Sequence, residues 1–186
     1  FSEINLNKQL QHAISDLGFT KQTPIQQESY SKILSGTDLV GIAQTGTGKT
    51  IAYCLPLLQE LSYSNQSNPR ILILVPTREL VAQVVDTLES LTEYITCRII
   101  GVYGGTNMNT QKIMLQDGAD IVVATPGRLY DLALCRAVQL KGIKKLVIDE
   151  VDVMLDLGFR PQLINIFELL QERRQNIMFS ATMTEE

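Results

Sequence analysis

The sequence predicts an α/β domain with a doubly wound, mainly parallel sheet that is covered by helices on both faces. Short runs of β-branched and other apolar residues alternate with amphipathic stretches of helical periodicity along the chain. Residues 71–75 read Ile-Leu-Ile-Leu-Val and are apolar throughout, which is typical of a parallel strand buried on both faces. Regular alternation also implies right-handed crossovers, and it places ligands beyond the carboxyl ends of the strands.

The elements are expected in a regular order along the chain. Residues 62–69 are rich in Ser and Asn, so we expect a polar surface loop there. Two helices, at residues 6–17 and 25–34, are expected before the first strand. Strands are expected at residues 39–43, 71–75, 98–102, 121–124, 146–149 and 177–179. Helices are expected between and after them at residues 51–61, 79–92, 106–117, 128–134 and 161–170.

The composition is that of an ordinary globular domain, with 45% apolar and 19% charged residues in a chain of 186. A chain of this length buries about 70% of its unfolded surface, so one domain is expected. The net charge of −4 argues against a broad basic surface for nucleic acid, but it allows a narrow site built on helix N-termini. No apolar run approaches the roughly 20 residues that cross a bilayer.

The cysteines and the first residue indicate the context of the chain. Cys54, Cys97 and Cys135 form no close pair, and the first two lie in apolar segments, so we expect core residues rather than metal ligands. Free cysteines predict a reducing, cytoplasmic compartment. The chain begins at Phe1 rather than Met, so we expect it to be a segment of a longer protein, and no leader-like segment marks it for export.

A glycine-rich stretch, residues 43–50, lies between the first expected strand and a helix. Its small residues let backbone N–H groups surround a phosphate, and the helix N-terminus adds a favourable dipole. Ala43 takes the place of the usual first Gly, so it must adopt an extended or right-handed backbone. The alternative is a plain Gly-rich turn, but Lys-Thr at the helix start favours a nucleotide. The residues expected to contact the nucleotide are Thr45, Gly46, Thr47, Gly48, Lys49, which reaches the β- and γ-phosphates, and Thr50, whose hydroxyl binds Mg²⁺.

Two adjacent carboxylates, Asp149 and Glu150, end the apolar strand expected at 146–149. A phosphoryl-transfer site needs an Asp that holds Mg²⁺ through its water shell, because Mg²⁺ dehydrates reluctantly. It also needs an acceptor that orients or deprotonates the attacking water. Asp149 suits the first role and Glu150 the second. The alternative is a solvated acidic turn, which is common after strands.

Short motifs occur in a fixed order along nearly the whole chain, and together they resemble the first RecA-like domain of the DEAD-box RNA helicases of superfamily 2. Each motif alone is weak, whereas the ordered set is specific. The resemblance implies a RecA-like, P-loop NTPase fold over residues 1–186, with an adenine-recognising Q-motif segment at 1–27. A second RecA-like domain is not found in this chain. The motifs stand at residues 18–26, 43–50, 76–80, 104–105, 125–128, 149–152 and 180–182, and Phe1 matches an upstream aromatic of the family.

The resemblance implies that Gln26 and Phe19 hold adenine, so that the preference for ATP over GTP rests on them. A carboxamide donates and accepts in one plane, which suits the Hoogsteen and exocyclic edge of adenine. An aromatic ring stacks on a base, an interaction worth about 1–3 kcal/mol. Without the resemblance, Phe19 reads as a core aromatic and Gln26 as a helix-surface amide.

The resemblance also implies a path for the backbone of single-stranded RNA, without reading of the bases. Thr77 and Thr125 precede helical stretches with free N–H groups at a positive dipole end, and two adjacent glycines allow close approach. The alternative is helix capping by both threonines and a plain turn at the glycines. The implied RNA-binding residues are Pro76, Thr77, Arg78, Gly104, Gly105, Thr125, Pro126, Gly127 and Arg128.

Three further residues, Asp152, Ser180 and Thr182, are implied to link the nucleotide state to strand separation. The alternative for them is a strand-end turn with local hydroxyl hydrogen bonds. The tetrapeptide that names the family has Ala at its third position, where this chain has Val151. We expect Val151 to lie at a packed strand end and activity to survive, although crowding near Asp152 could weaken the coupling.

The implied function is that of the ATP-binding lobe of an ATP-dependent RNA helicase, with ATP and Mg²⁺ as cofactors and Lys49, Asp149 and Glu150 as catalytic residues. The second lobe supplies arginine fingers in this family, and such an arginine is worth about 10³–10⁵ in rate. The chain alone is therefore expected to bind ATP weakly, to hydrolyse it poorly and to be monomeric. Two alternatives stay open: a nucleotide-gated RNA clamp or scaffold without productive unwinding, and a superfamily 2 DNA helicase.

Overall fold

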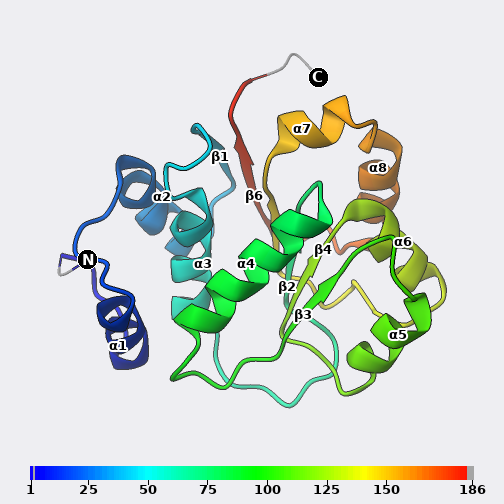
Figure 1. Ribbon diagram of the computed structural model, residues 1–186, viewed down its shortest axis with the longest axis horizontal. Helices are drawn as coiled ribbons and strands as arrows, with labels where there is room; N and C mark the ends of the chain where they lie inside the picture. Colours follow the sequence, from blue (N-terminus) through cyan, green and yellow to red (C-terminus); the bar gives the residue numbers. More distant parts are fainter. Residues whose placement is uncertain (2, 184–186) are drawn as a thin grey trace.

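The computed structural model describes residues 1 and 3–183, and its centre is a six-stranded sheet. All strand pairs in this sheet are parallel, and the strand order is β1-β6-β5-β2-β4-β3 (Figure 1). Parallel neighbours need crossover connections, which here contain the helices. The predicted doubly wound α/β class is therefore confirmed. The strands are β1 (Leu39–Ile42), β2 (Ile71–Leu74), β3 (Ile99–Val102), β4 (Ile121–Ala124), β5 (Lys145–Ile148) and β6 (Gln175–Ser180).

Eight helices occur in the described part of the chain, and they lie on both faces of the sheet (Figure 1). All the predicted helices and strands are present, with ends within two residues of the expected positions. Within residues 1 and 3–183, no helix has the length and apolar character needed to cross a membrane. The helices are α1 (Lys8–Asp16), α2 (Pro24–Leu34), α3 (Lys49–Glu60), α4 (Arg78–Leu91), α5 (Met108–Gln116), α6 (Pro126–Leu134), α7 (Val151–Asp156) and α8 (Arg160–Leu169).

Alternating strand residues send side chains to two separate apolar cores. One core joins the sheet to α1, α2, α3 and α4, and it contains Ile73, Val147 and Phe179. The other joins the opposite face to α6, α7, α8 and the end of α5, and it contains Leu72 and Leu146. Because both faces are covered in this way, the strands are apolar at successive positions. Cys54 is buried in the first core and Cys97 packs at its margin, as predicted.

Helix α7 is missing from the sequence prediction, and this changes the position of Val151. The structure ends β5 at Ile148 and begins α7 at Val151, which is half-buried. The predicted placement of Val151 at a packed strand end is therefore wrong. A helix of six residues is too short to show a clear apolar period, which is why the sequence pattern did not reveal it.

Helix α3 contains Pro56 in its interior, and a neighbouring helix compensates for it. Proline has no N–H, so it cannot donate to the carbonyl of Ala52 four residues earlier. The Oγ of Ser29 in α2 lies 3.4 Å from that carbonyl oxygen and 2.6 Å from the carbonyl oxygen of Ile25. A donor on α2 is thus directed toward the carbonyl that Pro56 leaves free, and both helices contribute to the site described below.

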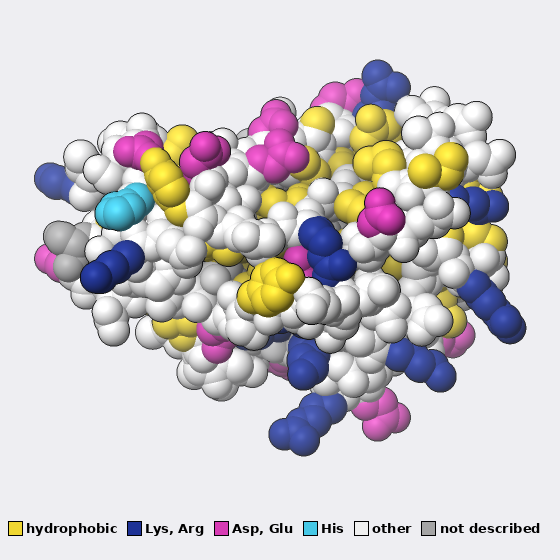
Figure 2. Space-filling view, turned by 90° about the horizontal axis from the view of Figure 1, so that it is seen from below, with side chains coloured by type: hydrophobic (Ala, Val, Ile, Leu, Met, Phe, Trp, Pro, Cys, Tyr) yellow, Lys and Arg dark blue, Asp and Glu magenta, His cyan; other side chains and the backbone are white. Residues whose placement is uncertain are grey.

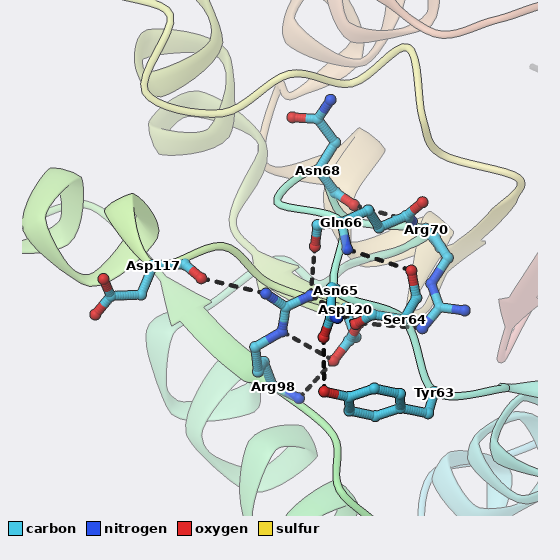
Figure 3. Close-up of polar contacts among 9 residues, drawn as sticks. All are labelled: Tyr63, Ser64, Asn65, Gln66, Asn68, Arg70, Arg98, Asp117 and Asp120. Carbon is cyan, nitrogen blue, oxygen red and sulfur yellow. Dashed lines mark hydrogen bonds and ion pairs between the residues drawn. The ribbon is translucent and has the colours of Figure 1, made fainter.

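An ion-pair cluster ties together the beginnings of three neighbouring strands (Figure 3). Asp120 precedes the middle strand β4, and its Oδ1 lies 3.0 Å from Arg70 Nη2 before β2 and 3.1 Å from Arg98 Nη2 before β3. Arg98 also donates to the carbonyl oxygens of Ser64 and Gln66. The predicted loop at residues 62–69 is thus a surface loop held by Arg98, at the end of the sheet away from the strands' carboxyl ends.

The charged side chains on this end of the molecule are mixed in sign. Figure 2 shows the molecule from below the view of Figure 1, with Lys and Arg interspersed among Asp and Glu. No broad basic area is visible on this face, in agreement with the net charge of −4. His12, the only histidine in the sequence, is exposed and meets the ring of Tyr94 edge-on, with ring centroids 5.7 Å apart.

Candidate active site

The loop between β1 and α3 has the backbone of a phosphate-binding turn. Gly46 and Gly48 have φ angles of 82° and 85°, in the left-handed region that favours glycine. Among the described non-glycine residues, positive φ occurs only at Arg136 and Glu150, so the expectation for Ala43 is confirmed. Helix α3 begins directly after the loop, so its free N–H groups and positive dipole end face the loop.

The lysine of this loop faces the first carboxylate of the acidic pair. Lys49 Nζ lies 3.8 Å from Asp149 Oδ1, and both side chains are more than nine-tenths buried. Lys49 starts α3 after β1, whereas Asp149 follows β5, so the contact spans the intervening strand β6. Lys49 Nζ has no hydrogen-bond partner among the described residues. A buried ammonium with unused donors is costly, which makes this position suited to an anionic ligand.

The two carboxylates differ in environment, although burial raises the pKa of both. For Asp149, burial is the largest cause, and the nearby charge of Lys49 opposes it without reversing it. For Glu150, burial is again the largest cause, and the negative charge of Asp149 adds to it. Glu150 is less buried and has a φ of 56°, a conformation that is strained for a residue with a side chain. A carboxylate with a raised pKa is a better proton acceptor, which suits a general base.

A single cavity of about 390 Å³ brings the loop and the carboxylates together. Side chains of α4 close its other side, namely Leu80, Gln83 and Val84. The convergence predicted from the sequence is thus observed in the structure. The loop and acidic residues that line the cavity are Thr45, Gly46, Gly48, Lys49, Thr50, Asp149 and Glu150.

The donor atoms in this cavity fit a magnesium ion. Mg²⁺ prefers hard oxygen ligands, and it is usually held by one or two protein groups together with water and phosphate. Thr50 contributes a hydroxyl oxygen and Asp149 a carboxylate, and both line the cavity. These are the residues that the sequence predicts for the metal.

The predicted Q-motif segment is attached to the phosphate loop by the side chain of Gln26. Its Oε1 accepts from the backbone N–H of Thr23 at 3.0 Å, and its Nε2 donates to the carbonyl oxygen of Gly48 at 3.2 Å. Gln26 is only 6% exposed, so the alternative of a surface amide is wrong. Both ends of the carboxamide are engaged with backbone groups in this structure, and adenine recognition by Gln26 stays a prediction.

Phe19 lies in an aromatic pair at the edge of the molecule. Its ring centroid is 6.3 Å from that of Phe1, with an angle of 50° between the rings. Phe19 is 40% exposed, so the alternative of a core aromatic is wrong. Stacking on adenine stays a prediction.

The three residues predicted to couple the site to its surroundings lie together. Asp152 Oδ2 accepts from the backbone N–H of Thr182 at 3.2 Å and from its hydroxyl at 3.0 Å. Ser180 Oγ accepts from the backbone N–H of Asp152 at 3.3 Å. Burial alone raises the pKa of Asp152, but hydrogen bonds from Thr182, Val153 and Ser180 outweigh it and lower the pKa. The start of α7 is therefore linked to the end of β6.

The segments predicted to bind RNA follow the carboxyl ends of β2, β4 and β3, which are neighbours in the sheet. Thr77 accepts from the N–H of Leu80 at 3.3 Å, so it does cap α4, whereas Thr125 makes no such capping bond among the described residues. Gly105 has a φ of 80°, and a Cβ added at Gly104 or Gly105 would meet no atom within 4 Å outside its chain neighbours. Open space and free helix N-termini thus lie along one edge, next to the nucleotide cavity.

Arg128 is predicted to bind RNA, but its guanidinium group is hydrogen-bonded to other residues of the protein. Its Nη1 donates to Gln111 Oε1 at 2.8 Å, and its Nη2 donates to the carbonyl oxygen of Thr106 at 3.0 Å. Gln111 is buried and also donates to the carbonyl oxygen of Tyr103 at 3.0 Å. The sequence analysis did not identify Gln111, because a single Gln in a helix carries no distinctive pattern. Arg78, in contrast, is exposed and pairs with Glu79 at 3.1 Å.

The fold and the site together define a class of protein. A glycine-rich loop leads from the edge strand of an all-parallel sheet into a helix, and its lysine faces an aspartate at the end of a nearby strand. This arrangement is that of a P-loop nucleotide-binding domain of the α/β class.

The chain belongs to the DEAD/DEAH box helicase family, whose sequence model matches residues 23–186. It is 41% identical over 190 residues to DEAD-box ATP-dependent RNA helicase 30 of Arabidopsis thaliana, covering 100% of this chain and 32% of that protein. It is 40% identical over 186 residues to ATP-dependent RNA helicase DeaD of Haemophilus influenzae, covering 100% of this chain and 30% of that protein. It is 45% identical over 174 residues to the human probable ATP-dependent RNA helicase DDX43, covering 91% of this chain and 27% of that protein. The chain thus spans about a third or less of these relatives.

Proposed function

We propose that this chain is the ATP-binding lobe of an ATP-dependent RNA helicase, which couples ATP hydrolysis to the binding and unwinding or remodelling of RNA. One observation carries the proposal: Lys49 Nζ lies 3.8 Å from Asp149 Oδ1 in a cavity that the phosphate loop also lines. The names of the relatives and the order of the motifs support the choice of RNA helicase among P-loop enzymes.

At the phosphate end of the site, each residue has a distinct role. Lys49 and the backbone N–H groups of the loop bind the phosphates, which satisfies the donors that are unused in the protein alone. Thr50 and Asp149 would hold Mg²⁺, which supplies positive charge that stabilises the transferring phosphoryl group. Glu150 orients the attacking water and accepts its proton, a role that its raised pKa supports.

At the base end, Gln26 and Phe19 bind adenine. Gln26 Nε2 also donates to the carbonyl oxygen of Gly48. An adenine that forms hydrogen bonds with the same carboxamide would therefore change this hydrogen bond to the phosphate loop. This connection supports a site that senses whether the base is present. Phe19 offers an exposed ring in the same segment of the chain.

RNA binds along the carboxyl ends of β2, β4 and β3 through its phosphodiester backbone. The start of α6 without a side-chain cap among the described residues, the N–H groups of α4 that Thr77 does not cap, and the open backbone at Gly104 and Gly105 support this path. If about four phosphates are neutralised on a single strand, log K against log salt has a slope near −3. Such contacts position a strand without reading its sequence.

The whole protein needs more than this chain. A second RecA-like lobe would supply an arginine to the transition state and the other half of the RNA site, so the isolated chain is a monomer with low ATPase activity. Three free cysteines, one of them exposed, support a reducing cytoplasmic compartment. A nucleotide-gated clamp or a superfamily 2 DNA helicase is the competing function.

Titration of the chain with ATP in the presence of Mg²⁺ tests the nucleotide site. Lys49→Ala should abolish measurable binding in calorimetry, because it removes the charge that faces the phosphates. An unchanged titration would refute the site. In the full-length parent, steady-state ATPase activity stimulated by RNA but not by DNA supports the helicase, whereas RNA binding without turnover supports the clamp.

A further inference from the structure

Tyr53 is a fully buried tyrosine in the second turn of α3, and its hydroxyl is not used by the roles described above. It has 0% of its surface exposed, and its ring packs on Phe179 with centroids 5.7 Å apart. The hydroxyl has no hydrogen-bond partner of standard geometry among the described residues. A buried hydroxyl without a partner is destabilising, and a phenylalanine ring would fill the same apolar space without this cost. Packing alone therefore does not account for the hydroxyl.

The position of Tyr53 on α3 directs it toward the site. Residues three and four apart lie on one face of a helix, so Tyr53 shares a face with Lys49 and Thr50. Burial, followed by the negative charge of Asp149, raises the pKa of the Tyr53 hydroxyl well above its usual value, which is consistent with a hydroxyl near that carboxylate. Lys49 Nζ and the Tyr53 hydroxyl, which both lack a hydrogen-bond partner among the described residues, thus lie on one face of α3, and Lys49 Nζ is 3.8 Å from the buried Asp149 carboxylate.

We propose that Tyr53 is a positioning residue of the magnesium site: its hydroxyl donates a hydrogen bond to the Asp149 carboxylate and fixes the orientation in which Asp149 serves the metal. The inference rests on the proposed function, because it assigns Tyr53 to the same site. In the protein alone the hydroxyl has no hydrogen-bond partner among the described residues. When Lys49 binds the phosphates, Tyr53 remains as a donor to the carboxylate. A neutral hydroxyl suits this role, since it orients the carboxylate without cancelling its charge.

The test compares Tyr53→Phe with Tyr30→Phe in the 186-residue chain. Tyr30 is a matched control, because it is 7% exposed and its hydroxyl also lacks a hydrogen-bond partner among the described residues. The carboxylate whose charge raises the pKa of Tyr30 is Glu60 rather than Asp149. ATP affinity is measured by calorimetry in excess Mg²⁺ and again in EDTA. The quantity compared is the dissociation constant in EDTA divided by the dissociation constant in Mg²⁺, which reports how much the metal contributes to binding.

We expect Tyr53→Phe to reduce this ratio about 3- to 10-fold, because hydrogen bonds to a charged acceptor are among the stronger kinds. Affinity in EDTA should stay within about twofold of the wild type, since the phosphate contacts are intact. Tyr30→Phe should leave both values unchanged. In an Asp149→Asn background, Tyr53→Phe should cause no further change in the ratio, because the charged acceptor is absent.

An unchanged ratio in Tyr53→Phe would overturn the inference and leave Tyr53 as a packing residue. An equal loss of affinity with and without Mg²⁺ would also overturn it, because a general disturbance of α3 acts on both. Thermal unfolding without nucleotide checks the fold, and we expect the midpoint of Tyr53→Phe to equal or exceed that of the wild type. A wild type that does not bind ATP at all would instead refute the proposed function, so the two failures are distinct.

Discussion

The contact between the Q-motif segment and the phosphate loop can be tested by adding a single methyl group at Gly48. A Cβ built there would lie 2.5 Å from Gln26 Nε2 and 3.3 Å from Thr23 Oγ1. The closest atom is the end of a side chain, so we expect the Gln26 carboxamide to be displaced rather than the backbone. The displaced carboxamide loses its bonds to Gly48 and Thr23.

The size of the effect follows from two contributions. A left-handed backbone costs a residue with a Cβ about 1–2 kcal/mol relative to glycine. The two lost hydrogen bonds add about 0.5–1.5 kcal/mol each. Gly48→Ala should therefore lower the free energy of unfolding by about 2–5 kcal/mol. Gly46 is the control, because it has a φ of 82° but no atom within 4 Å of an added Cβ, so Gly46→Ala should cost only about 1–2 kcal/mol.

Urea unfolding without nucleotide measures these differences, provided that the slope with urea stays the same. The double variant Gly48→Ala, Gln26→Ala loses the two hydrogen bonds only once, so the two effects should be non-additive by about 1–3 kcal/mol. Equal destabilisation by Gly46→Ala and Gly48→Ala, together with full additivity with Gln26→Ala, would refute the reasoning.

Three other predictions concern base recognition, hydrolysis and acid stability. Gln26→Ala should narrow the preference for ATP over GTP in competition binding, and an unchanged ratio counts against the assignment. Glu150→Gln in the full-length parent should retain ATP but slow hydrolysis at least about 100-fold, and near-normal turnover would exclude Glu150 as the base. Burial raises the pKa of Asp120, but hydrogen bonds from Arg98 and Arg70 outweigh it and hold the pKa below its usual value. Its stabilisation is therefore complete at neutral pH and is lost as the pH falls below about 4, so Asp120→Asn should cost about 2 kcal/mol in urea unfolding at pH 7 and less at pH 3. A cost of Asp120→Asn that is larger at pH 3 than at pH 7 would contradict this pH dependence.

Much of the fold could be predicted from the sequence, because buried parallel strands leave continuous apolar runs such as residues 71–75. The phosphate loop and the acidic pair could also be placed, since each directly follows a strand and the carboxyl ends of parallel strands share one edge. Helix α7 could not be predicted, because six residues after a left-handed Glu150 leave no periodic signal. Because α7 begins at Val151, this residue lies at a helix start and not at the strand end expected from the sequence.

The side-chain partners within the site could not be predicted in the same way. Gln26 has two backbone partners, and Arg128 is held by Gln111 and the carbonyl of Thr106. These contacts join segments that are 17 to 22 residues apart or lie within one helix start, and their geometry depends on how the loops pack. In the sequence Tyr53 resembles any core aromatic, and only the structure shows that its hydroxyl is buried without a hydrogen-bond partner among the described residues.

The strand order divides the sheet into two halves, β1-β6-β5 and β2-β4-β3. Residues 71–134 form an uninterrupted stretch that builds β2, β3 and β4 with their helices, whereas the phosphate loop comes before it and the acidic pair after it. Within the sheet this stretch joins the rest of the strands through one pairing, β2 with β5. Within the sheet the stretch therefore has one boundary with the remaining strands, and its helices α4 and α6 also pack on helices outside it. A chimera that exchanges it for the corresponding stretch of a relative would replace the segments predicted to bind RNA together with the α4 wall of the nucleotide cavity, and it would keep the phosphate loop and the acidic pair.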